Sequence, residues 1–598
     1  MRKTLHKAAK PPRSLLGDFT ADRRVLVLIA MAVVVGVAST VSAWILLKLI
    51  ALITSLVWTG HMGVAGASPA HVKALWWIVA APALGGLAIG LIARFGSEKI
   101  RGHGIPEAIE AILIGGSRMQ PKVALLKPLS SAISIGTGGP FGAEGPIIMT
   151  GGAIGSLFAQ CFHLAAAERK TLLVAGAASG MTAIFNTPLA AVLLAVELLL
   201  FEWKPRSFIP VVAAAVVAAA CRPLMFAVGP LFPFSANPVL SWWGLPVCIV
   251  VGIIAGLQSG AITQILYAAE DLFERLPVHW MWWPMLGGLV VGLGGLIEPR
   301  ALGVGYDVIR DLLSGHMVLA DAGRMLLVKS VIWIVALASG TSGGVLAPLL
   351  ILGGTAGWLE GQILPGNASF WAMLGMAAMM SGTMRSPLTA VMFAVELTGN
   401  TGALLPLLAA AGSAQAVTVL LLKRSILTEK IARHGQHVTR EYSVDLFELL
   451  RVQDVMVKKI DTLPADMPID EAVGFFTSDE ERHKSYPVVT NGGNLVGMVT
   501  RSDVLRWRTE KDHSGEVLYD LISDTSLVVS YPDEVLGRAA DRMVAADLGR
   551  IPIVDRERQK IVGLLARKDL LRIRSVSTAA ERHREAFFGR TEKKAVGS

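Results

Sequence analysis

Long apolar runs recur along most of this chain, and they constrain its fold more than any other feature. The runs begin at Val25 and continue to Leu422, and each has roughly the 20-residue length that crosses a lipid bilayer. Of the 598 residues, 53% are hydrophobic and only 17% are charged, a composition that excludes an ordinary soluble protein. Beyond Leu422 the sequence becomes charged. We therefore expect a polytopic α-helical membrane domain, residues 25–435, followed by a soluble domain.

Residues 1–24 form a basic arm in front of the first apolar run. Positive charge beside the first span favours a cytoplasmic N-terminus, so the net charge of +9 does not require a nucleic-acid partner. The arm is too long, and the run from Val25 too extended, for a cleavable signal peptide. The three cysteines, Cys161, Cys221 and Cys248, show no metal or redox spacing, and we expect them to be packing residues.

One glycine-rich stretch, residues 136–155, lies between two apolar segments and contains a single ionisable residue, Glu144. A carboxylate at membrane depth is costly and is therefore a candidate functional residue. The neighbouring glycines permit close backbone approach, and Pro146 suits the first turn of a helix. Because the start of a helix attracts anions, Glu144 could occupy an anion site and be displaced by a mobile anion. The alternative is a glycine-rich helix contact around a buried, protonated glutamate.

The second half of the membrane domain repeats the first. Residues 187–198 match residues 386–397, which pairs Glu197 with Glu396 at an offset of 199 residues. Further matches at offsets of 201 and 202 residues are Gly102-His-Gly104 with Gly303-Val-Gly305, Lys127 with Lys329, Pro146 with Pro348, and Gly151-Gly-Ala-Ile-Gly155 with Gly353-Gly-Thr-Ala-Gly357. A nearly constant offset indicates an internal duplication, with repeats over about residues 25–230 and 240–435. Paired helix breaks in two such halves predict a transport site at their interface.

Three of these stretches resemble the anion-binding signatures of the CLC chloride channels and transporters. They are Gly102-His-Gly-Ile-Pro106, Gly142-Ala-Glu-Gly-Pro146 and Gly343-Gly-Val-Leu-Ala-Pro348, where the family usually has GSGIP, G(K/R)EGP and GGIFAP. The resemblance extends from about Val25 to Gly435. It implies inverted repeats, a homodimer with a separate pathway for a small anion in each subunit, and both termini in the cytoplasm. The expected location is a bacterial inner membrane, surrounded by lipid.

The resemblance also assigns roles to residues. It implies that Glu144 is the gating glutamate. It implies that the anion is bound by the three signatures and by one later residue, which together are Gly102, His103, Gly104, Ile105, Pro106, Gly142, Ala143, Gly145, Pro146, Gly344, Val345, Leu346 and Leu427.

The sequence departs from the family pattern at three of these positions. His103 replaces a serine whose hydroxyl contacts the anion; a neutral imidazole N–H can also donate a hydrogen bond, and a protonated one adds charge. A histidine turned away, with only backbone N–H groups lining the site, is an equal alternative. Ala143 replaces a Lys or Arg, which removes a cation from the entrance, and Leu427 replaces a tyrosine that often coordinates the anion.

A fourth departure bears on the mechanism. Leu198 stands where proton-coupled members of the family often keep an acid that relays protons from the cytoplasm, and a leucine cannot relay a proton. Glu202 lies about one turn further on and is the residue that would complete a proton path with Glu144. The pattern favours a chloride channel. A proton-coupled chloride or fluoride exchanger of the same fold stays open, because some coupled relatives also lack the inner acid.

Two units of similar length, residues 450–510 and 515–575, precede a charged tail at residues 576–598. Each has two short β-branched strands followed by a helix, and together they resemble a tandem CBS pair, a small cytosolic α/β regulatory module that often binds adenine nucleotides. In that resemblance Thr500 and Asp503 meet phosphate and ribose hydroxyls, and Asp569 is the match in the second unit. Ala566 replaces the second hydroxyl residue, so we expect one intact and one impaired nucleotide site. A purely structural dimerisation module is the alternative.

No enzyme motif or metal-ligand spacing stands out, so we expect no catalytic residue, no metal and no required cofactor. A CBS-bearing magnesium transporter is the remaining alternative class. It would need intramembrane carboxylates or carbonyls as oxygen ligands, whereas the membrane motifs here are Gly/Pro helix starts and carboxylates within the apolar segments are few. The sequence therefore predicts anion transport, with chloride as the bound ion.

Overall fold

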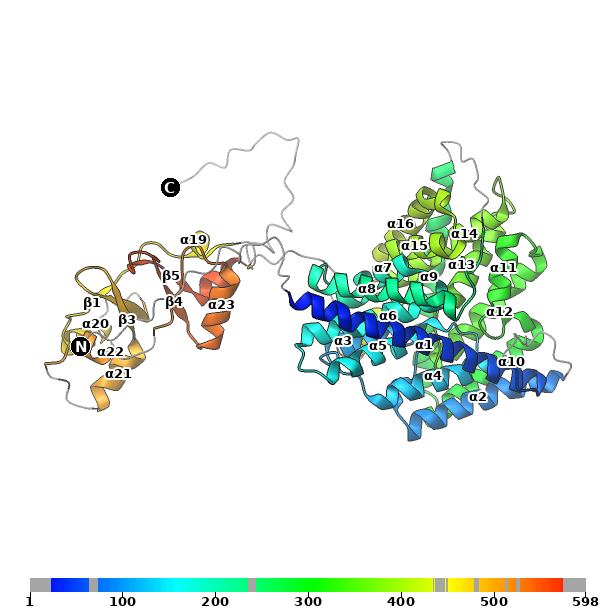
Figure 1. The fold of residues 1–598 in the computed structure, drawn as a ribbon, viewed down its shortest axis with the longest axis horizontal. Helices are drawn as coiled ribbons and strands as arrows, with labels where there is room; N and C mark the ends of the chain where they lie inside the picture. The colour runs from blue at the N-terminus through cyan, green and yellow to red at the C-terminus, as the bar shows by residue number, and fades with distance from the viewer. Residues whose placement is uncertain are drawn as a thin grey trace. The chain divides into compact units, whose positions relative to one another are not determined.

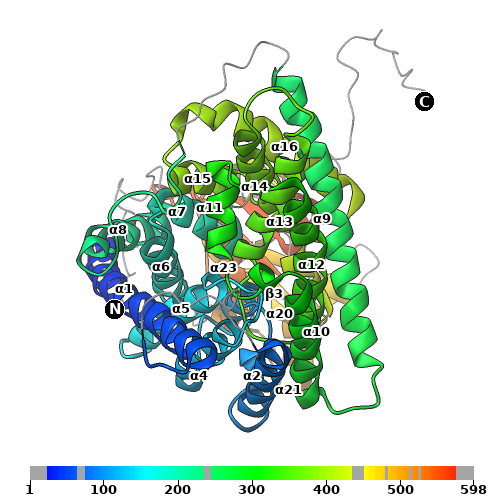
Figure 2. The same ribbon diagram turned by 90° about the vertical axis from the view of Figure 1, so that its right-hand side faces the viewer.

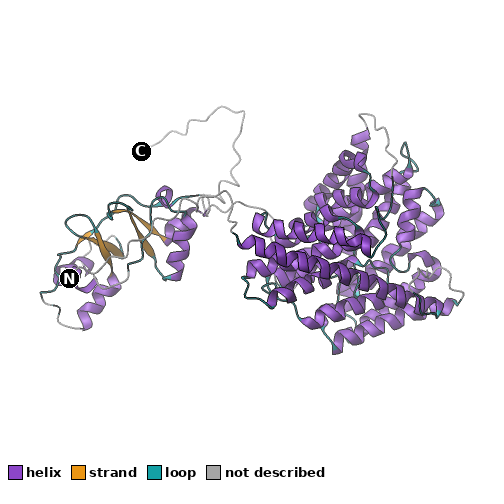
Figure 3. Ribbon diagram, viewed as in Figure 1, coloured by secondary structure: helices purple, strands orange, loops and turns teal. Residues whose placement is uncertain are grey.

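The computed structural model describes residues 23–63, 74–234, 244–433, 435, 447, 450–477, 483–510, 513, 515–522 and 527–573. The chain divides into two compact units, residues 1–440 and 441–598. The described part of the first unit consists of helices and their connections, and all described strands belong to the second unit (Figures 1 and 3). The prediction of a helical polytopic fold followed by a small α/β module is confirmed.

The first repeat of the helical unit contains eight α-helices and one π-helical turn within its described residues. They are α1 (Arg24–Thr59), α2 (Leu75–Phe95), α3 (Ile105–Leu113), α4 (Pro121–Gly136), α5 (Glu144–Gln160), α6 (Ala166–Phe185), α7 (Pro188–Leu194), η4 (Ala195–Leu200) and α8 (Pro205–Cys221).

The second repeat follows the same order, with α9 to α16 corresponding to α1 to α8. Its helices are α9 (Gly244–Glu274), α10 (Trp283–Ile297), α11 (Tyr306–Ser314), α12 (Leu319–Ala338), α13 (Leu346–Glu360), α14 (Ala368–Met384), α15 (Pro387–Thr398) and α16 (Leu404–Leu421), followed by α17 (Ile426–Arg433).

The two repeats pack against each other through α2 with α10 and through α7 with α15. Within the repeats, α1 packs on α4, α6 and α8, and α9 packs on α12, α14 and α16. Figure 2 shows α1 and α9 on opposite sides of the unit, with α5 and α13 between them. The first residues of α5 and α13, Glu144 and Leu346, are fully buried.

Six helical stretches in the described residues are long and apolar enough to cross a membrane. They are Arg24–Thr59, Leu75–Phe95, Pro205–Leu224, Gly244–Glu274, Trp280–Ile297 and Thr401–Arg433. Shorter apolar helices include Pro188–Leu200, Leu346–Glu360 and Pro387–Thr398. A helix too short to span places its end at membrane depth, which is tolerated where that end is buried in protein or lines a polar cavity.

The apolar sequence of residues 172–200 is broken in the structure. Helix α6 ends at Phe185, Asn186 adopts a left-handed conformation with φ 59°, and α7 begins at Pro188. Arg385 takes the same conformation, with φ 57°, between α14 and α15. Proline disfavours helical geometry in the preceding residue, which explains why both breaks occur in front of the matching Pro-Leu sequences.

Small residues set the helix crossings in both repeats. A Cβ added at Gly151 of α5 would collide with the carbonyl oxygen of Gly176 in α6, and a Cβ at Gly353 of α13 would collide with that of Gly375 in α14. Such close approach is typical of membrane helices, where association depends on van der Waals contact rather than on exclusion of water. The duplicated glycines therefore have a duplicated packing role.

The second unit contains two small sheets with separate apolar cores. The first sheet has the order β1 (Leu463–Pro464), β2 (Ser485–Val489), β3 (Leu495–Thr500) and is followed by α21 (Arg501–Glu510). The second pairs β4 (Arg550–Val554) with β5 (Ile561–Ala566) and is followed by a helix at residues 567–573. The remaining helices are α19 (Val452–Val455), α20 (Ile469–Thr477), α22 (Leu518–Ile522) and α23 (Leu536–Ala545).

Candidate anion-binding site

Glu144 is the first residue of α5, and its carboxylate reaches the start of α13 in the other repeat. The side chain is fully buried. Its Oε1 accepts a hydrogen bond of 2.9 Å from the backbone N–H of Ala347, while Oε2 is buried and has no hydrogen-bond partner in the described part of the chain. The carboxylate therefore occupies a position where free N–H groups and the helix dipole favour an anion.

Two glycines make room for this carboxylate. Gly142 and Gly344 pair as an isolated antiparallel bridge, with N–H to O distances of 3.2 and 2.9 Å. A Cβ at Gly142 would collide with the carboxylate of Glu144, and a Cβ at Gly344 would lie 2.7 Å from its Cδ. The two predicted signatures thus meet directly, and neither position accepts a side chain without displacing Glu144.

The chain before α3 is held by a buried lysine. Gly102 and Gly104 both have positive φ, 85° and 92°. Lys127 of α4 is fully buried and donates hydrogen bonds of 2.7 Å to the carbonyls of Ile100 and Gly102. These bonds present the turn toward α5, where a Cβ at Gly145 would collide with the carbonyl of His103.

His103 lies in this turn and is only 3% exposed. Its Nδ1 is buried and has no hydrogen-bond partner among the described residues. The residue also lines a large cavity, which makes it the link between the buried site and that cavity.

This cavity has a volume of about 510 Å³ and is lined by both signs of charge. Its carboxylates are Glu98, Glu107, Glu110, Glu270 and Glu274, and its cations are Lys99, Arg101, Lys430 and Arg433. Lys430 of α17 forms an ion pair of 2.5 Å with Glu107, whose other oxygen accepts from the Gly104 N–H at 2.8 Å. We call this cavity the vestibule.

Arg101 and Lys430 were not predicted as site residues. The Arg101 guanidinium lies over the rings of Trp280 and Trp283, 4.7 and 5.6 Å from their centroids. Arg101 directly precedes the Gly102 signature, which was a usable sequence signal. Lys430 is 323 residues from Glu107, and no local pattern connects the two.

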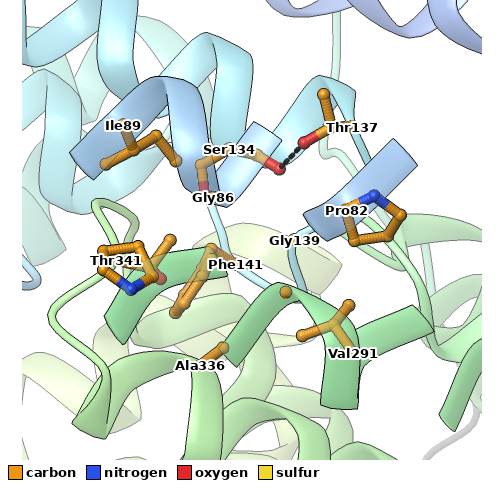
Figure 4. Close-up of a pocket in the computed structure, with 12 residues that line it drawn as sticks. Pro82, Gly86, Ile89, Ser134, Thr137, Gly139, Phe141, Val291, Ala336 and Thr341 are labelled. Atoms are coloured by element: carbon orange, nitrogen blue, oxygen red, sulfur yellow. Dashed lines mark hydrogen bonds between the residues drawn. The ribbon is translucent and has the colours of Figure 1, made fainter. Parts of the chain in front are cut away.

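A second, small cavity of about 10 Å³ lies beside Phe141, near the size that holds one water molecule. Figure 4 shows Phe141 among Val291, Ala336 and Thr341. The buried Ser134 Oγ beside it has no hydrogen-bond partner in the described residues. The lining carries hydroxyls but no charged side chain, in contrast to the vestibule.

Leu427 lies in α17 and is fully buried. It cannot donate a hydrogen bond to an anion. The preceding carbonyl, that of Ile426, accepts a bond of 2.5 Å from the hydroxyl of Tyr267 in α9. A different tyrosine, Tyr306 at the start of α11, has a buried hydroxyl without a partner in the described residues and interacts electrostatically with Glu144.

The two matching glutamates form reciprocal contacts between the repeats. Glu197 accepts hydrogen bonds from the N–H groups of Leu388 and Thr389 at the start of α15. Glu396 accepts bonds from the N–H groups of Leu189 and Ala190 at the start of α7. Each carboxylate caps the opposite helix start, which is a structural role for both.

Leu198 is fully buried, and Glu202 is engaged nearby. Glu202 forms an ion pair of 3.0 Å with Lys170 and accepts a hydrogen bond of 2.7 Å from Ser207. Burial raises the pKa of Glu202, but the hydrogen bonds from Ser207 and Lys170 outweigh burial, so its pKa lies below the ordinary value. These contacts hold Glu202 in its charged form.

In the second unit, the residues predicted to bind nucleotide are in two places. The carboxylate of Asp503 accepts bonds of 3.0 and 2.6 Å from the N–H and hydroxyl of Thr500. Asp569 accepts a bond of 3.0 Å from the N–H of Ala566, and both line a cavity of about 90 Å³. That cavity also contains Arg550 and Lys568, and neither Thr500 nor Asp503 lines it.

The described residues contain no group of three or more His, Cys, Asp or Glu side chains placed to hold a metal ion. The helical unit instead brings together two helix starts, a buried carboxylate and a cavity lined by charged side chains.

Comparison with known proteins agrees with this chemistry. Residues 84–419, more than half of the chain, match the family described as voltage gated chloride channel, and residues 452–510 and 518–575 match the CBS domain. Proteins named voltage-gated ClC-type chloride channel ClcB, from Salmonella typhi and from Escherichia coli O17:K52:H18, are each 30% identical over 371 residues, which cover 60% of this chain and 88% of theirs.

Solved structures show the same fold. A slow cyanobacterial Cl⁻/H⁺ antiporter has a TM-score of 0.59 at 22% identity and covers 69% of this chain and 99% of its own. A CLC-type fluoride/proton antiporter has a TM-score of 0.59 at 18% identity, covering 67% and 97%. The chain is therefore a multi-pass membrane protein of the CLC family of chloride channels and transporters, with two CBS domains after its membrane unit.

Proposed function

We propose that the helical unit conducts chloride passively through a pathway gated by Glu144. The observation that carries this proposal is the buried carboxylate hydrogen-bonded to the Ala347 N–H at the start of α13. In its charged form the carboxylate competes with a mobile anion for that position. Acidification neutralises it, weakens its hold on the N–H group and opens the position to chloride.

A passive pathway fits the surroundings of Glu144 better than tight proton coupling. Coupling requires a second group that takes up the proton from the other side of the membrane. Leu198 cannot do so, and Glu202 is kept charged by Lys170 and Ser207. A proton crossing apolar packing without a carrier faces a large desolvation cost.

The test is the reversal potential of purified protein in planar bilayers under crossed chloride and pH gradients. We expect the potential to follow the chloride gradient alone and to be unaffected by the pH gradient. A potential that shifts with the pH gradient would contradict the channel and establish exchange.

Two variants test whether Glu144 is the gate. Glu144→Gln should make chloride flux insensitive to pH, because the side chain no longer ionises. Asp321→Asn removes a carboxylate that is 38% exposed and does not line the vestibule, and it serves as the matched control. Unchanged pH dependence in Glu144→Gln would show that Glu144 is a packing residue.

Proton-coupled exchange of chloride or fluoride is the second candidate. It is favoured by the vestibule-lining His103, since the histidine replaces the usual serine and changes the donor offered to the anion. Liposomes loaded with a pH-sensitive dye distinguish the cases: an outward fluoride or chloride gradient that drives protons uphill supports exchange.

We further propose that the CBS pair binds an adenine nucleotide weakly and regulates flux. The sequence predicted the intact site at Thr500 and Asp503, but we place the proposed site in the cavity beside Asp569, because Arg550 and Lys568 there provide cations for phosphate next to a carboxylate for ribose hydroxyls. Calorimetry of the full-length protein with ATP, ADP and AMP tests this. Asp569→Ala should abolish the heat and Asp503→Ala should not; the reverse result would assign the site to Thr500 and Asp503.

We propose a homodimer with cytoplasmic termini. Exposed leucines on α7, α15 and α16, among them Leu189, Leu388 and Leu405, supply an apolar face for a second copy. Cysteine cross-linking at Leu405→Cys in membranes should yield a dimer, and a tag at either end should be protected from protease outside intact cells.

A further inference from the structure

A third cavity of the helical unit lies where α1, α6 and α8 begin, and no residue of the anion signatures lines it. Its volume is about 190 Å³. Its polar lining comes from Arg24 of α1, from Glu168 and Thr171 of α6, and from Arg206 and Ser207 of α8. None of these residues lines the vestibule.

The side chains that line this cavity carry one more positive than negative charge, Arg24 and Arg206 against Glu168. Arg24 pairs with Glu168 at 2.5 Å, and Lys170 pairs with Glu202 at 3.0 Å. Arg206 is the lining cation without an ion pair among the described residues; Glu202, already paired with Lys170, also attracts it electrostatically. The Nε of Arg206 is buried without a hydrogen-bond partner in the same part of the chain. A buried guanidinium donor without a partner is costly, so an anionic ligand at this position would remove an existing penalty.

The position of the cavity along the helices indicates its depth. Two of the stretches able to cross a membrane, Arg24–Thr59 and Pro205–Leu224, begin at it. Trp203, just before α8, is 60% exposed and stacks on Phe208 with ring centroids 5.3 Å apart. Arginines at a span end and an exposed tryptophan are typical of the lipid headgroup level.

Apolar surface continues from the cavity along both helices. Leu26 and Val27 of α1 and Ile209 of α8 are exposed within one turn or so of the basic residues. A ligand with a phosphate at one end and hydrocarbon at the other would satisfy both surfaces. Basic pockets between membrane helices bind anionic lipid headgroups in this way.

We propose that this cavity binds the phosphate of an anionic phospholipid, with Arg206 as the phosphate-binding residue and the acyl chains along α1 and α8. Guanidinium and phosphate form charge-assisted, often paired hydrogen bonds. The single excess cation matches a lipid of one net negative charge. Dissolved phosphate offers the same oxygens but leaves the exposed leucine, valine and isoleucine without a partner.

The test is native mass spectrometry of the full-length protein in detergent, titrated with phosphatidylglycerol, phosphatidylcholine or glycerol phosphate. We expect retained phosphatidylglycerol, less phosphatidylcholine and no retained glycerol phosphate. Arg206→Gln should weaken phosphatidylglycerol binding by about tenfold, the loss of one charge-assisted interaction. Arg275→Gln, an exposed residue just after α9, makes the same charge change away from the cavity.

Equal phosphatidylglycerol binding by Arg206→Gln and Arg275→Gln would overturn the proposal, and so would glycerol phosphate binding as well as the lipid. A photoreactive phosphatidylglycerol on the wild-type protein gives an assay that does not depend on a variant folding. It should label peptides at the starts of α1 and α8; labelling confined to other helices would reject the site.

Discussion

The two repeats of the helical unit build the same turn in front of a helix and then place different chemistry in it. Lys127 donates two hydrogen bonds to carbonyls in front of α3, and Lys329 donates two to carbonyls in front of α11. Both lysines are fully buried. The backbone of the turn is thus fixed in the same way twice.

The side chains that the two repeats bring to the centre differ. The first repeat provides Glu144 at the start of α5, whereas the second provides Leu346 at the matching start of α13. The carboxylate of one repeat consequently meets the free N–H groups of the other. The duplication supplies two helix starts, and the difference at one position places the carboxylate of the first repeat against the helix start of the second, as the proposed gate requires.

The largest expected effect comes from breaking the shared turn. Lys127→Met and Lys329→Met each leave two buried carbonyls unpaired, at about 1–3 kcal/mol per group. We expect each substitution to lower the free energy of unfolding by roughly 2–6 kcal/mol, measured as a lower melting temperature in detergent.

Lys127→Met should lower the free energy of unfolding more than Lys329→Met does. Lys127 also interacts with Glu107, whose side chain is 14% exposed, while the acid near Lys329 is Asp307, which is 54% exposed. Equal losses, or a smaller loss for Lys127→Met, would show that the surrounding carboxylates do not distinguish the repeats.

The reciprocal glutamates give the next effect. Glu197 accepts a third hydrogen bond, 2.5 Å from the hydroxyl of Thr389, where Glu396 faces Ala190. Removing either cap should lower the free energy of unfolding by about 0.5–2 kcal/mol. The loss should be about 1 kcal/mol larger for Glu197→Gln than for Glu396→Gln. Thr389→Ala should reduce the difference; if the difference persists in Thr389→Ala, the hydroxyl is not its cause.

The third comparison concerns selectivity. His103→Val gives the first repeat the residue that the second has at Val304. If the imidazole donates to the anion, its loss should change the ratio of chloride to fluoride permeability by about two- to tenfold, the value of one neutral hydrogen bond. His103→Ser should restore part of the ratio. An unchanged ratio in both variants would mean that only backbone groups line the site.

The smallest effect concerns pH. The pKa of Glu202 lies below its ordinary value because of Ser207 and Lys170. Ionised Glu202 therefore stabilises the folded protein at pH values above its pKa in the unfolded chain. This stabilisation is lost as pH falls through the pKa of Glu202 in the folded protein. Because the Lys170–Glu202 pair is partly exposed, we expect it to contribute less than about 1 kcal/mol to the free energy of unfolding. Glu202→Gln should flatten the decline of melting temperature between neutral pH and about pH 4; an identical decline would remove Glu202 from the acid response.

Several features of the chain follow from local sequence. Apolar length determined the membrane unit, and repeated motifs at a nearly constant offset determined the duplication. Gly142-Ala-Glu-Gly-Pro146 marked a helix start with a carboxylate, because glycine permits unusual backbone angles and proline fixes φ within a few residues. The structure places Glu144 at such a start.

Other features depended on contacts between distant residues. Glu144 and Ala347 are 203 residues apart, and Glu197 and Thr389 are 192 apart, so no local pattern could show which helix start each carboxylate occupies. The burial of Leu427, the pairing of Glu202 with Lys170, and the cavity at Arg206 likewise arise from packing. Sequence determined which groups are present, because backbone preference and hydrophobicity act locally. The tertiary structure alone decided which charges are neutralised, because that depends on what lies opposite them after the repeats have packed together.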